Sequence, residues 1–299
     1  MPTNAVTELI RALSSQGVEV VDLTQPLSES TPVIDLPEPY VNSPGLSRRE
    51  LARYDERNPL ARWDVLELGE HTGTHVDAPI HWITGRGGKD IASIEVERLV
   101  GPAVVIDKSA EVAKDPGYLL TLADLEAFEA DHGEIPSGAW VLFRADWDKR
   151  IGDKESFFNL GPEGPVTPGP DVAASKWLAE ARDISGFGME TVGPDAGAAG
   201  GFDPPWPAHH FILGAGRCTM SSLTNLDKLP PTGALIVVAP VKLVDGTAGL
   251  ARRTPPARRA PDPRSWQRRR GRRSVDHRRL RGASTGCGRF GDRGATRRL

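Results

Sequence analysis

The alternation of hydrophobic and polar positions along residues 1–250 predicts short strands interleaved with helices. Runs of aliphatic and β-branched residues bounded by Gly or Pro are typical of strands. One helix has a clear beginning and end: Thr121 and Asp124 have the spacing of a capping box, and Gly133 follows as a stop signal. A second helix is predicted over residues 171–182. The predicted strands cover residues 18–23, 63–68, 100–106, 139–143, 184–189 and 234–241.

This order of elements favours a mixed α/β fold in a single domain, residues 1–250. Two Pro-rich stretches, residues 162–170 and 203–207, are predicted to be loops that shape a site. The run Ala234–Val241 is the longest apolar stretch, and its Ile and Val residues predict a buried strand. It is far shorter than the roughly 18–20 apolar residues of a membrane-spanning helix. No signal peptide is expected, so the pattern predicts a cytoplasmic protein that does not enter a membrane.

Charge divides the chain at residue 250. Residues 251–299 contain 17 Arg, no Lys and three Asp, a net charge of +14. The other residues contain 20 basic and 37 acidic side chains, a net charge of −17, so the overall charge of −3 describes neither part. Clustered Arg makes nucleic-acid binding an alternative function class, because phosphate contacts release counterions. The acidic body and the absence of a recognition motif argue against a nucleic-acid partner.

The tail, residues 251–299, is interpreted as a frameshifted or mis-assigned terminus, or as a disordered basic arm. It has few large apolar residues and neither the helical nor the strand period, so it cannot bury enough surface to fold. Its Pro residues also lack the backbone donors of a sheet ladder. We therefore expect no central strand after about Arg253. The strand Ala234–Val241 is then expected to have an unprotected edge.

Composition narrows the candidate chemistry. The chain has only two Cys, Cys218 and Cys287, which excludes a disulfide scaffold and a Cys-based zinc site. It has seven His, and three of them lie with one carboxylate in the segment HTGTHVDAPIH, residues 71–81. This density of imidazoles makes the segment the candidate site.

Residues 71–81 are predicted to form a turn followed by an extended stretch. Their Thr, Gly and Val residues are poor helix formers, and Pro79 would break a helix. In an extended stretch His75 and Asp77 point the same way, and the glycine before them lets the backbone curl so that His71 approaches. The pattern therefore predicts two imidazoles and a carboxylate in one place.

This donor set suits Zn²⁺, Mn²⁺ or Fe²⁺ and leaves positions open for water and substrate. A bound metal lowers the pKa of its water toward ~7, which makes hydroxide available at neutral pH. His81 lies beyond the triad His71, His75 and Asp77, behind a stiff Pro, and is the candidate general acid and base.

The motif H-x-G-T-H-x-D-x-P-x-H resembles the signature of the cyclase superfamily, whose members include kynurenine formamidases and isatin hydrolases. The resemblance spans roughly residues 18–248. It implies a swivelling β/β/α fold with a mixed central sheet, a divalent metal, and hydrolysis of a C–N or similar acyl bond. It also implies that His71, His75 and Asp77 bind the metal and that His81 is catalytic. Further similar stretches are WVLFRADW (140–147), GFGMETVGPDAG (186–197), PAHHFILGAG (207–216) and LTNLDKLPPTGALIVVAPVKL (223–243).

Further residues are predicted to lie on the side of the substrate or of a second metal ion. The family's histidine in P-A-H-x-x-L-L-G corresponds to His209, which there joins a second metal or the substrate. Kynurenine formamidases have a metal-binding Glu twelve residues later, where this chain has Ser221, and a Trp where this chain has Ile34. A hydroxyl is a far poorer ligand than a carboxylate, so we expect one Mn²⁺ or Zn²⁺ per chain and no other cofactor. Trp82 is a candidate wall for a flat substrate.

Four further residues leave two interpretations open. Trp63 and Trp206 extend the aromatic wall or pack in the core. Asp195 and Glu190 orient site residues or cap turns. A last departure from the family lies at Ala248, where Arg- and Pro-rich sequence replaces the family's last core strand and adds to the frameshift interpretation.

These features together resemble the isatin hydrolase branch most, which uses one metal, usually manganese. The sequence therefore predicts a metal-dependent amide hydrolase that opens an aryl lactam of the isatin type. In this hypothesis hydroxide attacks the carbonyl, and His81 moves the water proton to the leaving nitrogen. The alternative substrate is N-formylkynurenine, in tryptophan catabolism, and a third interpretation is a metal-binding protein without turnover. The expected partners are a small aromatic amide substrate and further copies of the chain, in a homodimer or homotetramer as the family implies.

Overall fold

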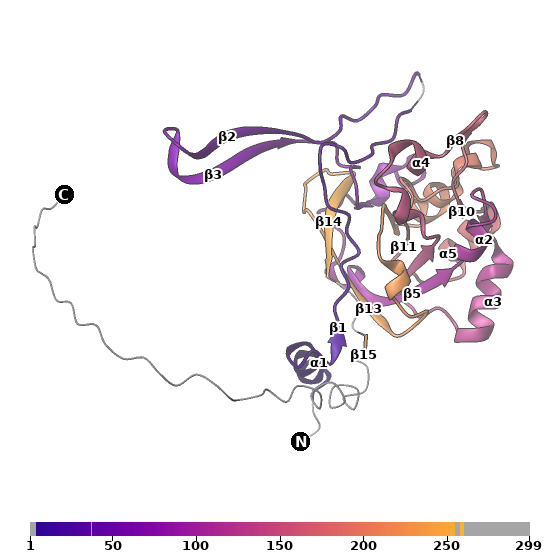
Figure 1. Ribbon diagram of the computed structural model, residues 1–299. Coiled ribbons are helices and arrows are strands. Elements are labelled where there is room, and N and C mark those ends of the chain that lie inside the picture. Colours follow the sequence, from indigo (N-terminus) through magenta and orange to yellow (C-terminus); the bar gives the residue numbers. More distant parts are fainter. Residues whose placement is uncertain (1–3, 37, 255–257, 260–299) are drawn as a thin grey trace, which may run out of the picture. The chain divides into compact units, whose positions relative to one another are not determined.

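The computed structural model describes residues 4–36, 38–254 and 258–259, and a closed seven-stranded barrel lies at its centre (Figure 1). The barrel strands are β4 (His75–Asp77), β5 (Val100–Asp107), β7 (Trp140–Arg144), β11 (Gly186–Met189), β12 (Cys218–Ser221), β13 (Ala234–Pro240) and β14 (Ala248–Thr254). Their order is β11-β12-β4-β14-β13-β5-β7. The strands from β5 through β7 and β11 to β12 pair in parallel, and the other pairs are antiparallel. The predicted α/β class with a mixed sheet is confirmed.

Helices and short ladders connect these strands. The α-helices are α1 (Ala5–Ser14), α2 (Ser109–Val112), α3 (Leu122–His132), α4 (Lys154–Phe158) and α5 (Val172–Glu180). Single turns of 3₁₀-helix are η1 (Pro79–His81), η2 (Ile83–Gly85), η3 (Val96–Arg98), η4 (Trp147–Arg150), η5 (Gly197–Gly201) and η7 (Leu226–Lys228), and η6 (Ala208–Leu213) is a π-helix. The two-stranded ladders are β1 (Val18–Glu19) with β15 (Arg258–Arg259), β2 (Ser47–Asp55) with β3 (Asn58–Glu67), β6 (Leu119–Leu120) with β10 (Gly169–Pro170), and β8 (Leu160–Gly161) with β9 (Gly164–Pro165).

Helix α3 begins and ends where the sequence predicts. The backbone N–H of Asp124 donates to Thr121 Oγ1 at 3.2 Å, and the N–H of Thr121 donates to Asp124 Oδ2 at 2.9 Å, which forms the predicted capping box. Gly133 follows with φ +88°, a conformation that glycine adopts without a steric penalty. Helix α5 is likewise capped, by the side chain of Asp171.

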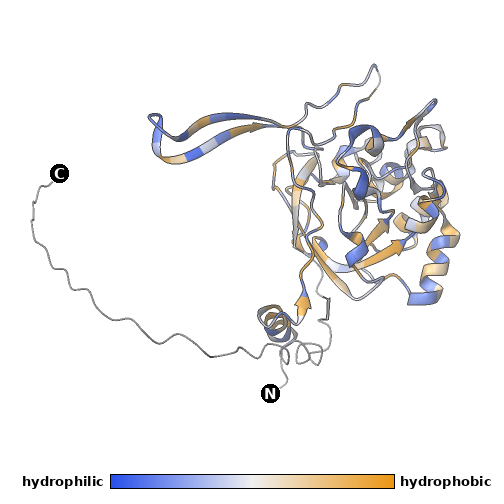
Figure 2. Cartoon of the chain, viewed as in Figure 1, coloured by the Kyte–Doolittle hydropathy of each residue, from blue (hydrophilic) through white to orange (hydrophobic). Residues whose placement is uncertain are grey.

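The strands β5 and β7 are buried on both faces. Val104 and Val141 pack in one apolar cluster with residues of α3 and α5, whereas Val105 and Leu142 pack in a second with residues of β4, β12 and β13. This alternation follows the two-residue period of a strand. It explains why the strands read as continuous apolar runs, which appear as orange ribbons in Figure 2.

The expected open edge of the strand at residues 234–241 is wrong. β13 pairs with β5 on one side and with β14 on the other, where Val238 is opposite Arg253 and Val237 is opposite Thr254. β14 also pairs with β4, so it closes the barrel and occupies the place of the strand that the sequence was expected to lack. A ladder requires only backbone donors and acceptors, and the Pro residues begin after Thr254. The disorder expected for residues 251–299 is wrong for residues 251–254, which are in β14, and for Arg258–Arg259, which pair with β1. Residues 255–257 and those from 260 onward lie outside the described range.

Two other strand predictions are corrected. Of residues 18–23 only Val18 and Glu19 are in a strand, although Val21 and Leu23 are buried. The strand predicted at 63–68 begins earlier and is the second half of the hairpin β2–β3, whose first half was not predicted. Over the described ranges, no helix is long and apolar enough to cross a membrane.

Candidate metal centre

Neighbouring segments bring the four predicted residues together. A turn carries His71, β4 carries His75 and Asp77, and η1 ends at His81. The backbone of β4 is extended, so His75 and Asp77 point the same way, as predicted. Gly73 in the turn has φ +61°, and a Cβ there would lie 2.4 Å from a methyl group of a neighbouring leucine. The turn that brings His71 back toward β4 therefore requires glycine.

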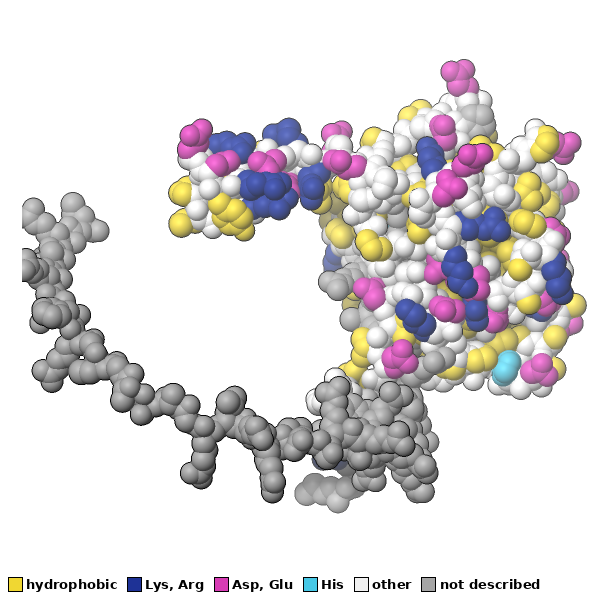
Figure 3. All heavy atoms as spheres, viewed as in Figure 1, with side chains coloured by type: hydrophobic (Ala, Val, Ile, Leu, Met, Phe, Trp, Pro, Cys, Tyr) yellow, Lys and Arg dark blue, Asp and Glu magenta, His cyan; other side chains and the backbone are white. Residues whose placement is uncertain are grey.

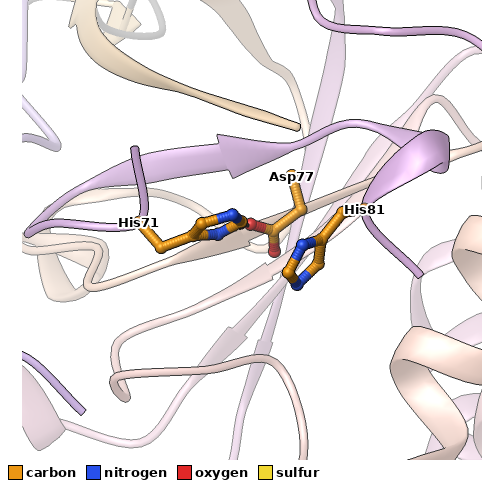
Figure 4. Close-up of side chains that lie close together, drawn as sticks. All are labelled: His71, Asp77 and His81. Carbon is orange, nitrogen blue, oxygen red and sulfur yellow. Dashed lines mark hydrogen bonds and ion pairs between the residues drawn. The ribbon is translucent and has the colours of Figure 1, made fainter. Parts of the chain in front are cut away.

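The hydrogen bonds of His71 indicate which of its nitrogens carries the proton. Thr247 Oγ1 lies 2.6 Å from Glu70 Oε2 and 3.1 Å from His71 Nε2. Because a carboxylate only accepts, the hydroxyl proton goes to Glu70, and the hydroxyl oxygen accepts from the Nε2–H of His71. In the neutral ring Nδ1 then has a lone pair, and it lies 2.9 Å from Asp77 Oδ1 (Figure 4).

His75 also directs a nitrogen lone pair toward Asp77. Its Nδ1 lies 2.7 Å from the carbonyl oxygen of Gly73, which only accepts, so Nδ1 carries the proton. The lone pair of Nε2 then faces Asp77 Oδ1 at 3.2 Å. Two nitrogen lone pairs and a carboxylate oxygen thus converge, and they repel unless a positive charge lies among them. Two imidazoles and a carboxylate fit a divalent transition metal or zinc.

Asp77 is buried and ionised. Its Oδ2 accepts a hydrogen bond of 2.6 Å from Thr219 Oγ1, the residue opposite it on β12. Burial raises the pKa of Asp77, but protonated imidazoles at His75 and His71, which carry charge and donate hydrogen bonds to it, outweigh burial and hold the pKa well below its usual value. When these imidazoles are neutral, as in the tautomers above, a cation would take over that role. A carboxylate that stays charged in the core is suited to bind a cation.

His81 completes the group. Possible ligand atoms of His71, Asp77 and His81 lie within 4.8 Å of one another, and the rings of His71 and His81 are 4.1 Å apart between centroids (Figure 4). Burial lowers the pKa of His81 to about 4; the neighbouring imidazoles add to this effect and Asp77 opposes it. The ring is therefore neutral at pH 7, so it has a lone pair to accept a proton or to bind metal.

The predicted substrate-side aromatic residues lie next to His81. The ring centroids of His81 and His209 are 5.5 Å apart, and Trp82 packs on His209 at 4.5 Å with an interplanar angle of 30°. Trp206 meets Trp82 edge to face at 5.8 Å, so it extends this wall. Trp63 lies on the hairpin β2–β3 with 57% of its surface exposed, so packing in the core is wrong for it, and it makes no ring contact with this wall among the described residues.

Asp195 orients His209. Its carboxylate accepts a hydrogen bond of 2.7 Å from the N–H of Ala208, the first residue of η6, and contacts Nδ1 of His209. A carboxylate there holds the proton on Nδ1 and leaves Nε2 of His209 with a free lone pair. Glu190, the other acid with two interpretations, caps a turn: its Oε2 accepts from the backbone N–H groups of Ala145 and Trp147.

Ser221 is buried at the end of β12, directly opposite His75. Its hydroxyl has no hydrogen-bond partner among the described residues. A hydroxyl is a far weaker ligand for a divalent cation than a carboxylate, so Ser221 offers little support for a second cation beside His75.

Sequence analysis missed three residues that support the ligands. Thr219 bonds Asp77, and Thr247 with Glu70 orients His71. Two weak signals existed: Glu70 directly precedes the first His, and Thr247 ends the D-G-T that precedes β14. Thr219 has no sequence signal, because the pairing of β12 with β4 alone brings it to Asp77.

Comparison with known proteins identifies the family. The Cyclase family model matches residues 21–196, more than half of the chain. The chain belongs to the cyclase family. It is 44% identical to isatin hydrolase from Roseibium aggregatum over 252 residues, which cover 83% of this chain and 95% of the relative. It is 30% identical to kynurenine formamidase from Salinibacter ruber, over 71% of this chain and 87% of the relative.

Solved structures agree with this membership. A crystal structure of an isatin hydrolase bound to the product analogue thioisatinate matches with a TM-score of 0.83 and 42% identity, over 86% of this chain and 98% of that one. A potential metal-dependent hydrolase with cyclase activity matches with a TM-score of 0.57 and 25% identity, over 82% of this chain. The cyclase-type fold predicted from the sequence is confirmed.

Proposed function

We propose that this chain is a metal-dependent amide hydrolase that opens the lactam ring of isatin-type substrates. The observation that carries the proposal is the 44% identity to an isatin hydrolase over 95% of that relative's length. The kynurenine formamidase of Salinibacter ruber, at 30% identity, is more distant. Hydrolysis of N-formylkynurenine, in tryptophan catabolism, is therefore the second candidate.

In this proposal His71, His75 and Asp77 hold one divalent cation, Mn²⁺ or Zn²⁺. When bound, such a cation polarises a carbonyl oxygen and makes hydroxide available at neutral pH. The protein keeps Asp77 ionised and presents one lone pair from each imidazole, and Thr247 fixes the ring of His71. The hydroxyl of Ser221 in place of a carboxylate supports one cation per chain rather than two.

His81 is proposed as the general acid and base. Its neutral ring accepts the proton of the attacking water and then donates it to the leaving nitrogen of the opened ring. His209, with its proton held on Nδ1 by Asp195, retains a lone pair on Nε2 and lies next to His81, where it is proposed to orient the substrate. Trp82 and Trp206 offer flat faces to an aromatic amide.

The proposed hydrolase domain contains residues 1–250 together with the last residues of β14 and the short strand β15, which pairs with β1, and the Arg-rich sequence from residue 261 onward is proposed to be a separate tail. The family resemblance also supports a homo-oligomer, either a dimer or a tetramer.

The test is turnover by the purified full chain after loading with Mn²⁺ or Zn²⁺. We expect the chain to open the ring of isatin, which is measured as a loss of the visible absorbance of isatin. The kcat/KM for isatin should be at least about tenfold above that for N-formylkynurenine, which corresponds to a difference of about 1.4 kcal/mol in activation free energy. The reverse preference would favour the formamidase. Metal binding without turnover of either amide would leave a metal-binding protein that is not a hydrolase.

A further inference from the structure

The neutral imidazole of His71 can carry its proton on either nitrogen, and only one of the two tautomers can bind a cation beside Asp77. Nδ1 of His71 lies 2.9 Å from Asp77 Oδ1 (Figure 4). With the proton on Nε2, the lone pair of Nδ1 is available to a cation. With the proton on Nδ1, the ring donates a hydrogen bond to Asp77 instead, and the lone pair points away from the centre. Another group must therefore select the tautomer.

The hydroxyl of Thr247 is that group, because its Oγ1 lies 3.1 Å from His71 Nε2. A hydroxyl can donate or accept, so by itself it is compatible with both tautomers. Glu70 removes the ambiguity. Its Oε2 lies 2.6 Å from Thr247 Oγ1, and a carboxylate only accepts, so the hydroxyl proton goes to Glu70. The role of Glu70 is thus to make the hydroxyl an acceptor for the Nε2–H of His71.

Backbone hydrogen bonds fix this pair in place. The same oxygen of Glu70 accepts from the backbone N–H groups of Thr247 and Ala248, at 2.8 and 3.0 Å. On the other side, the carbonyl oxygen of Thr247 accepts at 2.9 Å from the N–H of Ala78, the residue that follows β4. The backbone that carries the hydroxyl therefore cannot move away from His71 without the loss of these bonds.

The last barrel strand brings the hydroxyl to the centre. Thr247 is 176 positions from His71 in the sequence, and β14 begins directly after it. β14 pairs with β4, with Ala248 opposite Asp77. The pairing that closes the barrel therefore also completes the surroundings of a ligand that lies in a distant turn.

We propose that Glu70 and Thr247 are positioning residues that set the affinity of this centre for its cation, because they hold His71 in the tautomer whose Nδ1 can bind. The proposal rests on the proposed function, in which His71, His75 and Asp77 hold the cation. It extends that function, since neither positioning residue is a ligand and Glu70 acts only through the hydroxyl.

The first measurement requires no metal. ¹⁵N NMR of the metal-free full chain, labelled at its histidine side chains, reports which nitrogen of each neutral imidazole carries the proton, and His71→Gln assigns the signal of His71. The wild type should have the proton on Nε2. Thr247→Val has nearly the same shape but no hydroxyl, so Nε2 loses its acceptor. We expect the proton to move to Nδ1, where it is donated to Asp77.

The second measurement is the Kd for Mn²⁺ and for Zn²⁺, obtained by competition with a chelator. Thr247→Val should raise both values about 10–100-fold, the usual effect of losing a partner that orients a ligand. Thr247→Ser retains the hydroxyl and should restore both the Nε2–H tautomer and the affinity of the wild type.

Thr191→Val is the matched control. Thr191 is buried, and its Oγ1 donates a hydrogen bond of 2.7 Å to the carbonyl oxygen of Gly193 rather than to an imidazole. This variant should bind both ions like the wild type. Thermal unfolding of the metal-free chains verifies that both valine variants fold.

An unchanged tautomer in Thr247→Val, or a Kd equal to that of the wild type, overturns the proposal. An equal loss of affinity in Thr191→Val overturns it too, because the loss of any buried hydroxyl would then be sufficient. A wild type that binds neither ion would overturn the metal-dependent function and this proposal together. A wild type that binds metal, with Thr247→Val binding equally well, would overturn this proposal alone.

Discussion

The candidate metal centre and the hairpin β2–β3 depart from ordinary burial in opposite directions. At the centre, a carboxylate and an imidazole, those of Asp77 and His75, are almost fully buried in the barrel. On the hairpin, Trp63 is more than half exposed. Buried polar groups and exposed apolar patches are the two informative exceptions to the rule of an apolar interior. The two exceptions have different consequences.

The two regions differ in their surroundings. Lone pairs of His71 and His75 face one oxygen of Asp77, and a cation among them would satisfy all three atoms. On the hairpin β2–β3, Trp63 and Val65 remain exposed in the described chain, and Figure 3 shows hydrophobic and charged side chains together along it. The centre is held by a strand with neighbours on both sides, whereas the hairpin is held only by its own ladder. Substitutions at the first region should therefore affect the chemistry, whereas exposed positions of the second should tolerate substitution without loss of the barrel.

Loss of a ligand should give the largest effect. Asp77→Asn removes the charge that balances a cation, so we expect the chain to lose its metal and its hydrolase activity together. The loss should exceed the roughly 10²–10⁴-fold share of a general acid–base group. Elemental analysis after dialysis and an isatin assay measure both losses. Retention of one equivalent of metal would mean that Asp77 is not a required ligand and that the metal is held by other residues.

His81→Ala separates chemistry from metal binding. The variant should retain one equivalent of metal, because His71, His75 and Asp77 remain, while kcat falls about 10²–10⁴-fold. Elemental analysis is decisive, since His81 lies within 4.8 Å of two proposed ligands. A variant that loses metal and activity together would make His81 a ligand and would require another general base.

The sequence predicted what depends on local spacing. The capping box at Thr121 and the common direction of His75 and Asp77 follow from residues within four positions of one another. What it did not predict depends on pairing between distant strands. Thr219 reaches Asp77 only because β12 lies beside β4, and β14 forms from Arg-containing sequence because its backbone completes the barrel. The same limit explains why the position of Trp63 was not predicted. Its strand β3 pairs with β2, and β2 has no clear apolar period.

Glu190 tests whether every buried polar group signals function. Burial raises the pKa of Glu190 to about 8, and the charge of Asp148 adds to the shift. The folded state then retains a proton that the unfolded state releases above about pH 4.5, so stability falls as pH rises from about 4.5 to about 8. Glu190→Gln retains an oxygen for the N–H groups of Ala145 and Trp147 but has no proton to lose.

We therefore expect Glu190→Gln to remove this pH dependence and to stabilise the fold by about 3 kcal/mol at pH 7, with kcat/KM for isatin unchanged. Urea unfolding at a series of pH values gives the free energy, and the isatin assay gives the rate. A large loss of activity would place Glu190 in the catalytic machinery and weaken the contrast between structural and functional burial.

Substitution of Asp195 gives the smallest expected loss of activity. It distinguishes the helix-capping role of this carboxylate from its effect on the tautomer of His209. Its carboxylate both caps η6 through Ala208 and holds the proton on Nδ1 of His209. In Asp195→Asn the amide oxygen can still cap, but an amide hydrogen then faces Nδ1 and moves the ring proton to Nε2. We expect kcat to fall about 10–100-fold, the usual effect of losing an orienting partner, with stability nearly unchanged.

Asp171→Asn is the matched control, because Asp171 caps α5 through Ala174 in the same way and lies at no histidine. Asn and Asp are comparable caps, so this variant should retain wild-type kcat and its stability within about 0.5 kcal/mol. Equal kcat values for the two variants would show that Asp195 only caps η6. A lower kcat in Asp195→Asn but not in Asp171→Asn would show that the tautomer of His209 matters. Both substitutions change a helix-capping carboxylate to an amide, but only Asp195 lies beside an imidazole.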